Sequence, residues 1–191
     1  MKKGFWILAL VIAACGGSNS TTEYDDSQIP GGAIMQDYAG ISGLQKGTVT
    51  IDGITVGEGD FLNGRYHGTW TSYTNEGWPQ SITTYNNGKK QGIQLLFDNI
   101  GYVQVKASYY DDQLNGEYIV YNRRKISERK NYVSGVLHGI QERFYVDGTK
   151  MEESNYVNGK IDGMARWYDE EGNLTIEYEY EMGELIEESA K

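Results

Sequence analysis

The chain has 191 residues, a length typical of one domain with short appendages. Its formal net charge of −10 predicts repulsion from nucleic acid and from anionic lipid head groups, so neither is expected as a partner. A single cysteine excludes an intramolecular disulfide bond.

The first fourteen residues have the layout of a bacterial secretory signal. Lys2 and Lys3 give a basic start, residues 5–14 are apolar, and small residues precede Cys15. The apolar run is too short to span a membrane, which takes about 20 residues. We therefore predict that residues 1–14 are a signal peptide and are removed.

The residues Ile12-Ala13-Ala14-Cys15 resemble a bacterial lipobox. The resemblance implies that Cys15 is acylated with fatty acids such as palmitate, becomes the first mature residue and tethers a lipoprotein to the cell envelope, at the outer membrane. The alternative is an ordinary signal peptide with an incidental cysteine. Removing Lys2 and Lys3 leaves 15 of the 17 basic residues against 27 acidic ones, a net charge of −12, so we expect membrane contact through the lipid anchor only.

A segment rich in Gly, Ser, Thr and Asp follows at residues 15–43, with Pro30-Gly31-Gly32 in its middle. It has little apolar periodicity. This composition predicts a flexible tether between the lipidated cysteine and the folded part of the chain.

The rest of the chain is organised by regularly spaced aromatic residues. They recur every 12 residues, with one step of 11, although aromatic residues make up only 13% of the chain. The series is Phe61, Tyr73, Tyr85, Phe97, Tyr109, Tyr121, Tyr132, Phe144, Tyr156, Tyr168 and Tyr180. Such regularity indicates an internal structural repeat.

Glycines between these rings set a true period of about 24 residues. Two kinds of pair alternate along the chain, one like Asn63-Gly64 and the other like Glu76-Gly77. Pairs like Asn63-Gly64 predict tight hairpin turns, which need positive φ. Between the turns, apolar and polar residues alternate, as expected of strands with one covered face. A further set predicts bends near the strand starts: Gly68, Gly92, Gly116, Gly139 and Gly163.

One unit, residues 156–172, resembles the bacterial variant of the MORN repeat (membrane occupation and recognition nexus). We predict an all-β fold for residues 44–184, an elongated single-layer antiparallel β-meander built from β-hairpin repeats of about 24 residues, followed by an acidic C-terminal tail at 185–191. The repeat is degenerate at Asp111-Asp112 and at Arg123-Arg124-Lys125, where the glycines are missing.

The sequence contains no set of residues typical of an active site. His67 and His138 occupy equivalent places three repeats apart, too far to share a metal ion, and the acidic pairs fall mostly at turns. No metal or other cofactor is expected. We predict that the protein is not an enzyme.

Two groups of residues are candidates for binding. Trp70, Trp78 and Trp167 fall outside the aromatic series and would be contact anchors if exposed, although most aromatic residues of a repeat serve packing. Arg123, Arg124 and Lys125 concentrate positive charge in an acidic protein. They form either a solvated turn or a docking point for an acidic partner, including the acidic C-terminal segment of another copy.

These features favour a lipoprotein whose repeat sheet serves as a protein-binding or scaffold surface. The negative charge of the mature chain would suit a basic partner. The resemblance to the bacterial MORN variant implies an antitoxin or immunity-type role. The alternative is a glycan or cell-wall binding module that stacks Tyr and Trp rings on sugars.

Overall fold

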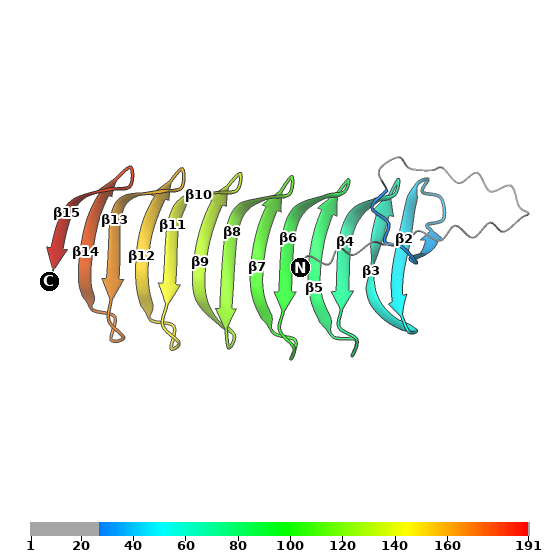
Figure 1. The fold of residues 1–191 in the computed structure, drawn as a ribbon, viewed down its shortest axis with the longest axis horizontal. Helices are drawn as coiled ribbons and strands as arrows, with labels where there is room; N and C mark the ends of the chain where they lie inside the picture. The colour runs from blue at the N-terminus through cyan, green and yellow to red at the C-terminus, as the bar shows by residue number, and fades with distance from the viewer. Residues whose placement is uncertain (1–26, 191) are drawn as a thin grey trace, which may run out of the picture.

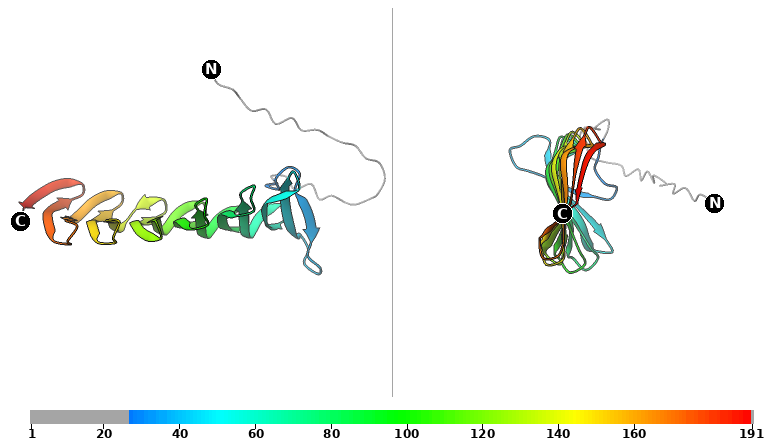
Figure 2. Two further views of the ribbon diagram at one scale, coloured as in Figure 1. Left: turned by 90° about the horizontal axis from the view of Figure 1, so that it is seen from below. Right: turned by 90° about the vertical axis from the view of Figure 1, so that its left-hand side faces the viewer.

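The computed structural model describes residues 27–190, with side-chain environments as far as Ile186. This part of the chain forms one open antiparallel sheet, drawn out into a long ribbon (Figures 1 and 2). Its strands are β1 (Ile34–Asp37), β2 (Leu44–Ile51), β3 (Ile54–Leu62), β4 (Arg65–Tyr73), β5 (Pro79–Asn86), β6 (Lys89–Phe97), β7 (Val103–Tyr110), β8 (Gln113–Asn122), β9 (Lys125–Val133), β10 (Val136–Leu137), β11 (Gly139–Phe144), β12 (Lys150–Val157), β13 (Lys160–Tyr168), β14 (Leu174–Glu181) and β15 (Glu184–Ala190).

The strands pair in the order in which they occur in the chain. Each strand from β1 to β9 hydrogen-bonds to the next, β9 pairs with β11, and the order then continues to β15, while the two-residue β10 pairs only with β9. Short turns leave consecutive strands no other arrangement than antiparallel neighbours. The predicted single-layer β-meander is therefore confirmed.

The tight turns have the backbone conformation that the Asn-Gly pairs predicted. At the β3–β4 turn, for example, φ is +50° at Asn63 and +77° at Gly64. Positive φ at both central residues gives a two-residue hairpin turn whose twist matches that of the strands. The degenerate pairs Asp111-Asp112 and Arg123-Arg124 keep positive φ at both residues, so the sheet passes through them without interruption.

The further glycine set lies at β-bulges. Gly92 has φ +103° and lies opposite Tyr109 of the next strand, and the equivalent glycines also have positive φ. On its other neighbouring strand, β5, the register of the pairing with β6 shifts near the same glycine. The predicted bends are confirmed, and they recur once in each repeat.

The sheet has two different faces. The packed face carries a row of cross-strand partners that includes most of the buried side chains: Thr83, Ala107, Gln141, Ser154 and Ala165. The opposite face, here called the ladder face, carries the neighbouring row that runs from Ile82 to Glu177. Because the ribbon is one layer thick, side chains of adjacent strands provide most of the cover that each strand has.

The aromatic series divides between these two faces. Phe61 and its partners at 24-residue spacing lie on the packed face, near the tight turns, where Tyr66 stacks on Tyr85 with ring centroids 4.9 Å apart. The alternate members lie two residues beyond the ladder row, at the other end of the strands: Tyr73, Phe97, Tyr121, Phe144 and Tyr168. The 12-residue spacing thus combines two series with opposite orientation.

The sheet extends further at both ends than the sequence predicted. Part of the predicted tether is ordered: β1 pairs with β2, and Gln28 accepts a hydrogen bond from the Tyr66 amide (3.2 Å) and donates one to the Gly88 carbonyl (3.1 Å). Four residues are too few for an alternating pattern to stand out, and these contacts are with distant segments. Most of the predicted acidic tail belongs to the edge strand β15.

The predicted signal peptide, the lipobox with Cys15 and the first part of the tether lie outside the described residues. Within residues 27–190, no helix is long and apolar enough to cross a membrane.

Candidate binding surface

One long edge of the ribbon is formed by similar five-residue turns, at residues 74–78, 98–102, 145–149 and 169–173 (lower edge in Figure 1). In the first of them, Thr74 N–H donates to the Trp78 carbonyl (2.8 Å) and Gly77 N–H donates to the Thr74 carbonyl (2.9 Å), and the other three repeat both hydrogen bonds. The β8–β9 turn with Arg123 and Arg124 lies in the same row. We call this row the long-turn edge.

The long-turn edge exposes large apolar side chains. The exposed fractions are 58% for Trp78, 74% for Ile100, 40% for Tyr102 and 68% for Val146. In the last turn of the row, the corresponding exposed residues are Glu170 and Glu171. The last turn of the edge therefore has no exposed large apolar side chain.

The basic residues of the degenerate repeat lie in the middle of this edge. The Arg124 guanidinium lies over the ring of Tyr102, 4.6 Å from its centroid, which is within range of a cation–π interaction. Lys125 donates a hydrogen bond from Nζ to the Asp147 carbonyl. Trp78, Arg123, Arg124 and Lys125, four of the six candidate residues, thus lie on one edge of the molecule.

A hollow opens on the ladder face beside Arg124. It has a volume of about 340 Å³ and is lined by Leu95, Tyr102, Val103, Lys106, Tyr121 and Arg124. The aliphatic and ring surfaces come from β6, β7, β8 and the β6–β7 turn, and Lys106 and Arg124 add two cations to the lining. The arrangement can hold an apolar group that carries a negative charge.

The other two candidate tryptophans are parts of the packing. Trp70 lies in a cluster with Phe61 and Tyr66, with ring centroids 5.5 and 5.0 Å away. Trp167 lies edge-on to Tyr178, with 5.4 Å between the ring centroids. Both side chains are half-buried, whereas Trp78 is exposed. Cross-strand neighbours thus cover part of both rings, and a binding role for Trp70 and Trp167 stays a prediction.

Burial also affects the tyrosines of the packed face. It raises the pKa of the Tyr66, Tyr85 and Tyr109 phenols above the ordinary value of 10.0, because the phenolate form loses solvation. These hydroxyls are therefore neutral at physiological pH and serve packing.

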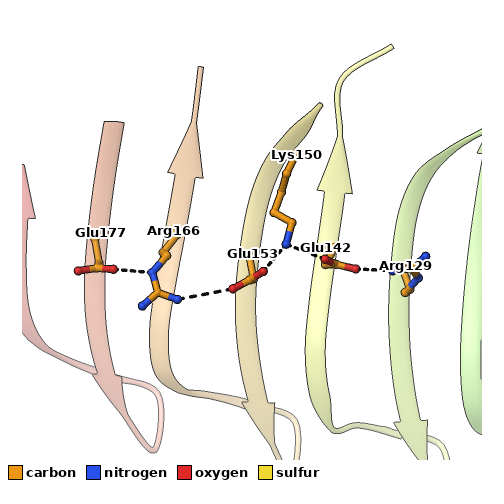
Figure 3. A network of polar contacts seen from close by, with 6 residues as sticks. All are labelled: Arg129, Glu142, Lys150, Glu153, Arg166 and Glu177. Carbon is orange, nitrogen blue, oxygen red and sulfur yellow. Dashed lines mark hydrogen bonds and ion pairs between the residues drawn. The ribbon is translucent and has the colours of Figure 1, made fainter. Parts of the chain in front are cut away.

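A ladder of alternating charges crosses five strands of the ladder face (Figure 3). Arg129 and Lys150 both bind Glu142, at 2.7 and 2.8 Å, and Lys150 also contacts Glu153. Farther along, Arg166 joins Glu153 (3.5 Å) to Glu177 (2.5 Å). Three cations and three carboxylates are thereby paired on half-buried sheet.

The ladder changes the titration of its carboxylates. Burial alone would raise the pKa of Glu142, but the hydrogen bonds and charges of Lys150 and Arg129 outweigh it and lower the pKa below 4.5. Glu142 and Glu153 are direct cross-strand partners, a placement that repulsion would disfavour without Lys150 between them. The ladder therefore stabilises the sheet. The candidate binding surface is the long-turn edge.

The two histidines lie on β4 and between β10 and β11, with five strands between them. Among residues 27–190, no three His, Cys, Asp or Glu side chains are placed to hold a metal ion. His67 Nδ1 is buried without a hydrogen-bond partner, and His138 is exposed. The structure does not bring the histidines together.

Comparison with known families identifies MORN repeats in the chain. The MORN repeat variant matches residues 66–87, 137–158 and 161–182. These segments correspond to the hairpins β4–β5, β11–β12 and β13–β14, and the same strand pairing continues through the unmatched stretch between them. MORN repeats are consistent with a binding or scaffold role. No curated protein matches the chain.

Sequence reasoning missed the residues that complete the hollow, above all Tyr102. A signal existed, since Tyr102 and Trp78 occupy the same position of consecutive repeats, each directly after the glycine of its turn. The sequence around Leu95 and Lys106 gave no signal, because these residues line the same hollow as Arg124 only when the strands pair.

Proposed function

We propose that this protein is a lipid-anchored lipoprotein of the bacterial cell envelope whose MORN-repeat sheet binds a protein partner along the long-turn edge. The observation that carries the proposal is the row of exposed Trp78, Ile100 and Tyr102 next to Arg124. Exposed apolar side chains that gather on one surface are typical of interaction sites, and Trp, Tyr and Arg provide most binding hot spots.

The shape of the sheet supports a protein as the ligand. A ribbon one layer thick offers an extended surface, and two hollows of the described residues, of about 240 and 340 Å³, are open depressions. Small-molecule sites usually enclose most of their ligand, whereas repeat proteins bind partners along an extended surface. No catalytic role is part of the proposal.

The charge of the chain bears on the nature of the partner. A mature protein with 27 acidic residues suits a partner that is basic overall, because complementary potentials speed association and exclude wrong partners. An antitoxin or immunity-type role, in which the partner is a toxin that this lipoprotein neutralises, is the concrete form of the proposal.

Attachment through Cys15 places the sheet at the outer membrane. Cells fed a labelled palmitate analogue should incorporate it into the full-length protein and not into a Cys15→Ser variant, which should leave the membrane fraction. If the variant is still labelled and remains in that fraction, the anchor lies elsewhere and this part of the proposal is wrong.

Binding is tested by crosslinking the full-length protein in cells and identifying what it captures. Replacing Trp78 or Ile100 with Ala should reduce capture of the specific partner at least about tenfold, the loss expected for an interface anchor. The matched control is Tyr110→Ala, which removes an equally exposed ring (62%) beside a tight turn on the opposite edge. Equal losses in all three variants would contradict a binding role for the long-turn edge.

The same experiment separates a protein from a glycan. Capture of a charged protein should weaken as salt screens the interaction. Binding to isolated cell-wall glycan that survives high salt and quenches tryptophan fluorescence would favour the glycan-binding alternative and overturn the proposal.

A further inference from the structure

The hollow beside Arg124 combines an apolar surface with positive charge. Leu95 and Val103 contribute aliphatic surface, and the rings of Tyr102 and Tyr121 lie beside them. Its volume of about 340 Å³ is at the small end of ligand sites, enough for one large side chain and its flanking backbone.

The cations at the hollow are available to a ligand. Arg124 contacts the face of Tyr102, and among residues 27–186, whose side chains the structure describes, neither Arg123 nor Arg124 forms an ion pair. Lys106 has a carboxylate neighbour, Glu117, at 3.4 Å, and this pair is solvent-exposed, so it is weak. A guanidinium without a carboxylate is suited to a two-point contact with an incoming carboxylate.

The backbone conformation of the β8–β9 turn indicates that Arg123 and Arg124 do not stabilise it. Arg123 and Arg124 have φ of +48° and +70°, a region that costs L-residues about 1–2 kcal/mol each. The other turn without glycine has an explanation in folding, because Asp112 accepts a hydrogen bond from the Lys90 amide (2.8 Å), whereas the exposed pair of Asp111 with Lys89 adds little. Strained backbone without such compensation is typical of functional sites.

We propose that this hollow binds an acidic peptide segment of the partner protein, with a carboxylate on Arg124 and an adjacent apolar side chain on Leu95 and Val103. The proposal rests on the proposed protein-binding function and adds the chemistry of the recognised segment. Charge complementarity with Arg124 and Lys106 in the hollow, and with Arg123 next to Arg124 in the chain, selects the acidic residues, and the aliphatic lining selects the apolar one. A partner that is basic overall can carry such a segment locally.

The test uses the full-length protein in mild detergent and a fluorescein-labelled peptide of alternating Glu and Leu residues. Fluorescence anisotropy should show binding that weakens with salt. Peptides with Lys in place of Glu, or Ser in place of Leu, should bind at least about tenfold more weakly, because each removes one of the two kinds of contact. Equal binding of all three peptides would overturn the proposal.

The decisive variant is Arg123→Asn/Arg124→Gly, which restores the turn sequence found elsewhere in the repeats. This variant should lower the affinity for the acidic peptide at least about tenfold. It should also raise Tm, because Asn and Gly adopt positive φ more easily than Arg does. Lys106→Glu should weaken the peptide as well. As the matched control, Lys89→Glu changes the same charge on β6 beside a tight turn, outside the hollow, and should leave binding unchanged. Unchanged affinity in the Asn-Gly variant would overturn the proposal.

Two other ligands carry negative charge and could fill the hollow in place of the peptide, and the test distinguishes them. Dimerisation without peptide in sedimentation velocity, abolished by the Asn-Gly variant, would show that the acidic C-terminal segment of a second copy fills the hollow. Displacement of the peptide by phosphatidylglycerol vesicles would identify a lipid head group. Either result overturns the proposal, whereas partner capture that depends on Trp78 but not on Arg124 leaves the proposed function intact.

Discussion

The two halves of the ladder row stabilise the same backbone in different ways. From β5 to β8 the row reads Ile82, Leu95, Lys106 and Ile119, and Ile119 is buried. From β9 to β14 it continues as charged residues: Arg129, Glu142, Glu153, Arg166 and Glu177. The strand pairing is the same in both halves. A repeat sheet therefore requires matched neighbours in each row and does not require an apolar row throughout.

The reason lies in the one-layer architecture. Each side chain of the row touches mainly its partners on the two adjacent strands, so stability is a sum of local pairs. Apolar neighbours stabilise the sheet because they leave water. Charged neighbours stabilise it only if their signs alternate or if a residue of opposite charge lies between them, as Lys150 does between Glu142 and Glu153.

Ile119→Ala should produce the largest loss in the free energy of unfolding, about 2–4 kcal/mol, because it removes a buried side chain that the sheet cannot refill. Chemical denaturation with constant m-value measures it. The control Ile93→Ala removes the same atoms from a side chain that is 45% exposed and should cost clearly less. Equal costs would contradict the apolar mode of the first half.

Lys150→Met should destabilise the protein by about 1–2 kcal/mol although it preserves the apolar stem, because Glu142 and Glu153 then face each other without the cation between them and each keeps only its arginine. The matched control is Lys89→Met, whose exposed pair with Asp111 should contribute nothing measurable. A loss of stability that is the same in both variants would show that the ladder adds nothing beyond ordinary surface pairs.

The ladder also predicts how stability depends on pH. The pKa of Glu142 is lower in the folded protein than its ordinary value of 4.5, so its contribution is fully present above pH 4.5 and is lost as pH falls through the folded pKa. Glu142→Gln should cost about 1 kcal/mol at neutral pH, the typical net contribution of one hydrogen bond, and should flatten the decline in stability below pH 4.5. Unfolding curves at several pH values test this, and an unaltered slope would rule out the linkage.

Lys106→Gln should have the smallest effect, below about 0.5 kcal/mol, because the exposed pair with Glu117 is screened by solvent. Thermal unfolding in low and high salt measures it. A large loss would mean that the Lys106 charge stabilises the sheet and would weaken its assignment to the peptide site.

Much of the fold could be predicted from the sequence because the repeat is written in residues with strong local preferences. Asn63-Gly64 and its equivalents specify tight turns, and the rings at regular spacing mark one strand each. The 12-residue spacing alone does not show the division of the rings between two faces. It follows from the two-residue turns, which place Phe61 and Tyr73 on opposite faces, and the bulge at Gly68 adds two residues to β4 and keeps this order. Strand β1 gave no local signal because four residues are too few for an alternating pattern.

The candidate site was predicted in part. Arg123, Arg124 and Trp78 are conspicuous in the sequence, since they lie where the repeat is broken or where a ring falls outside the series. Spacing alone could not distinguish Trp78 from Trp70, because only the cluster with Phe61 and Tyr66 shows that Trp70 is covered. Tyr102 and Arg124 meet across two turns, which a reading along the chain does not reveal.

The most direct test of the account is amide hydrogen exchange across the degenerate middle of the chain, because everything depends on one sheet that continues through it. Amides of β7, β8 and β9 that bond to neighbouring strands should be protected as strongly as those of β12 and β13. Fast exchange throughout residues 103–133, with protection on either side, would contradict a continuous ribbon and the surface built on it.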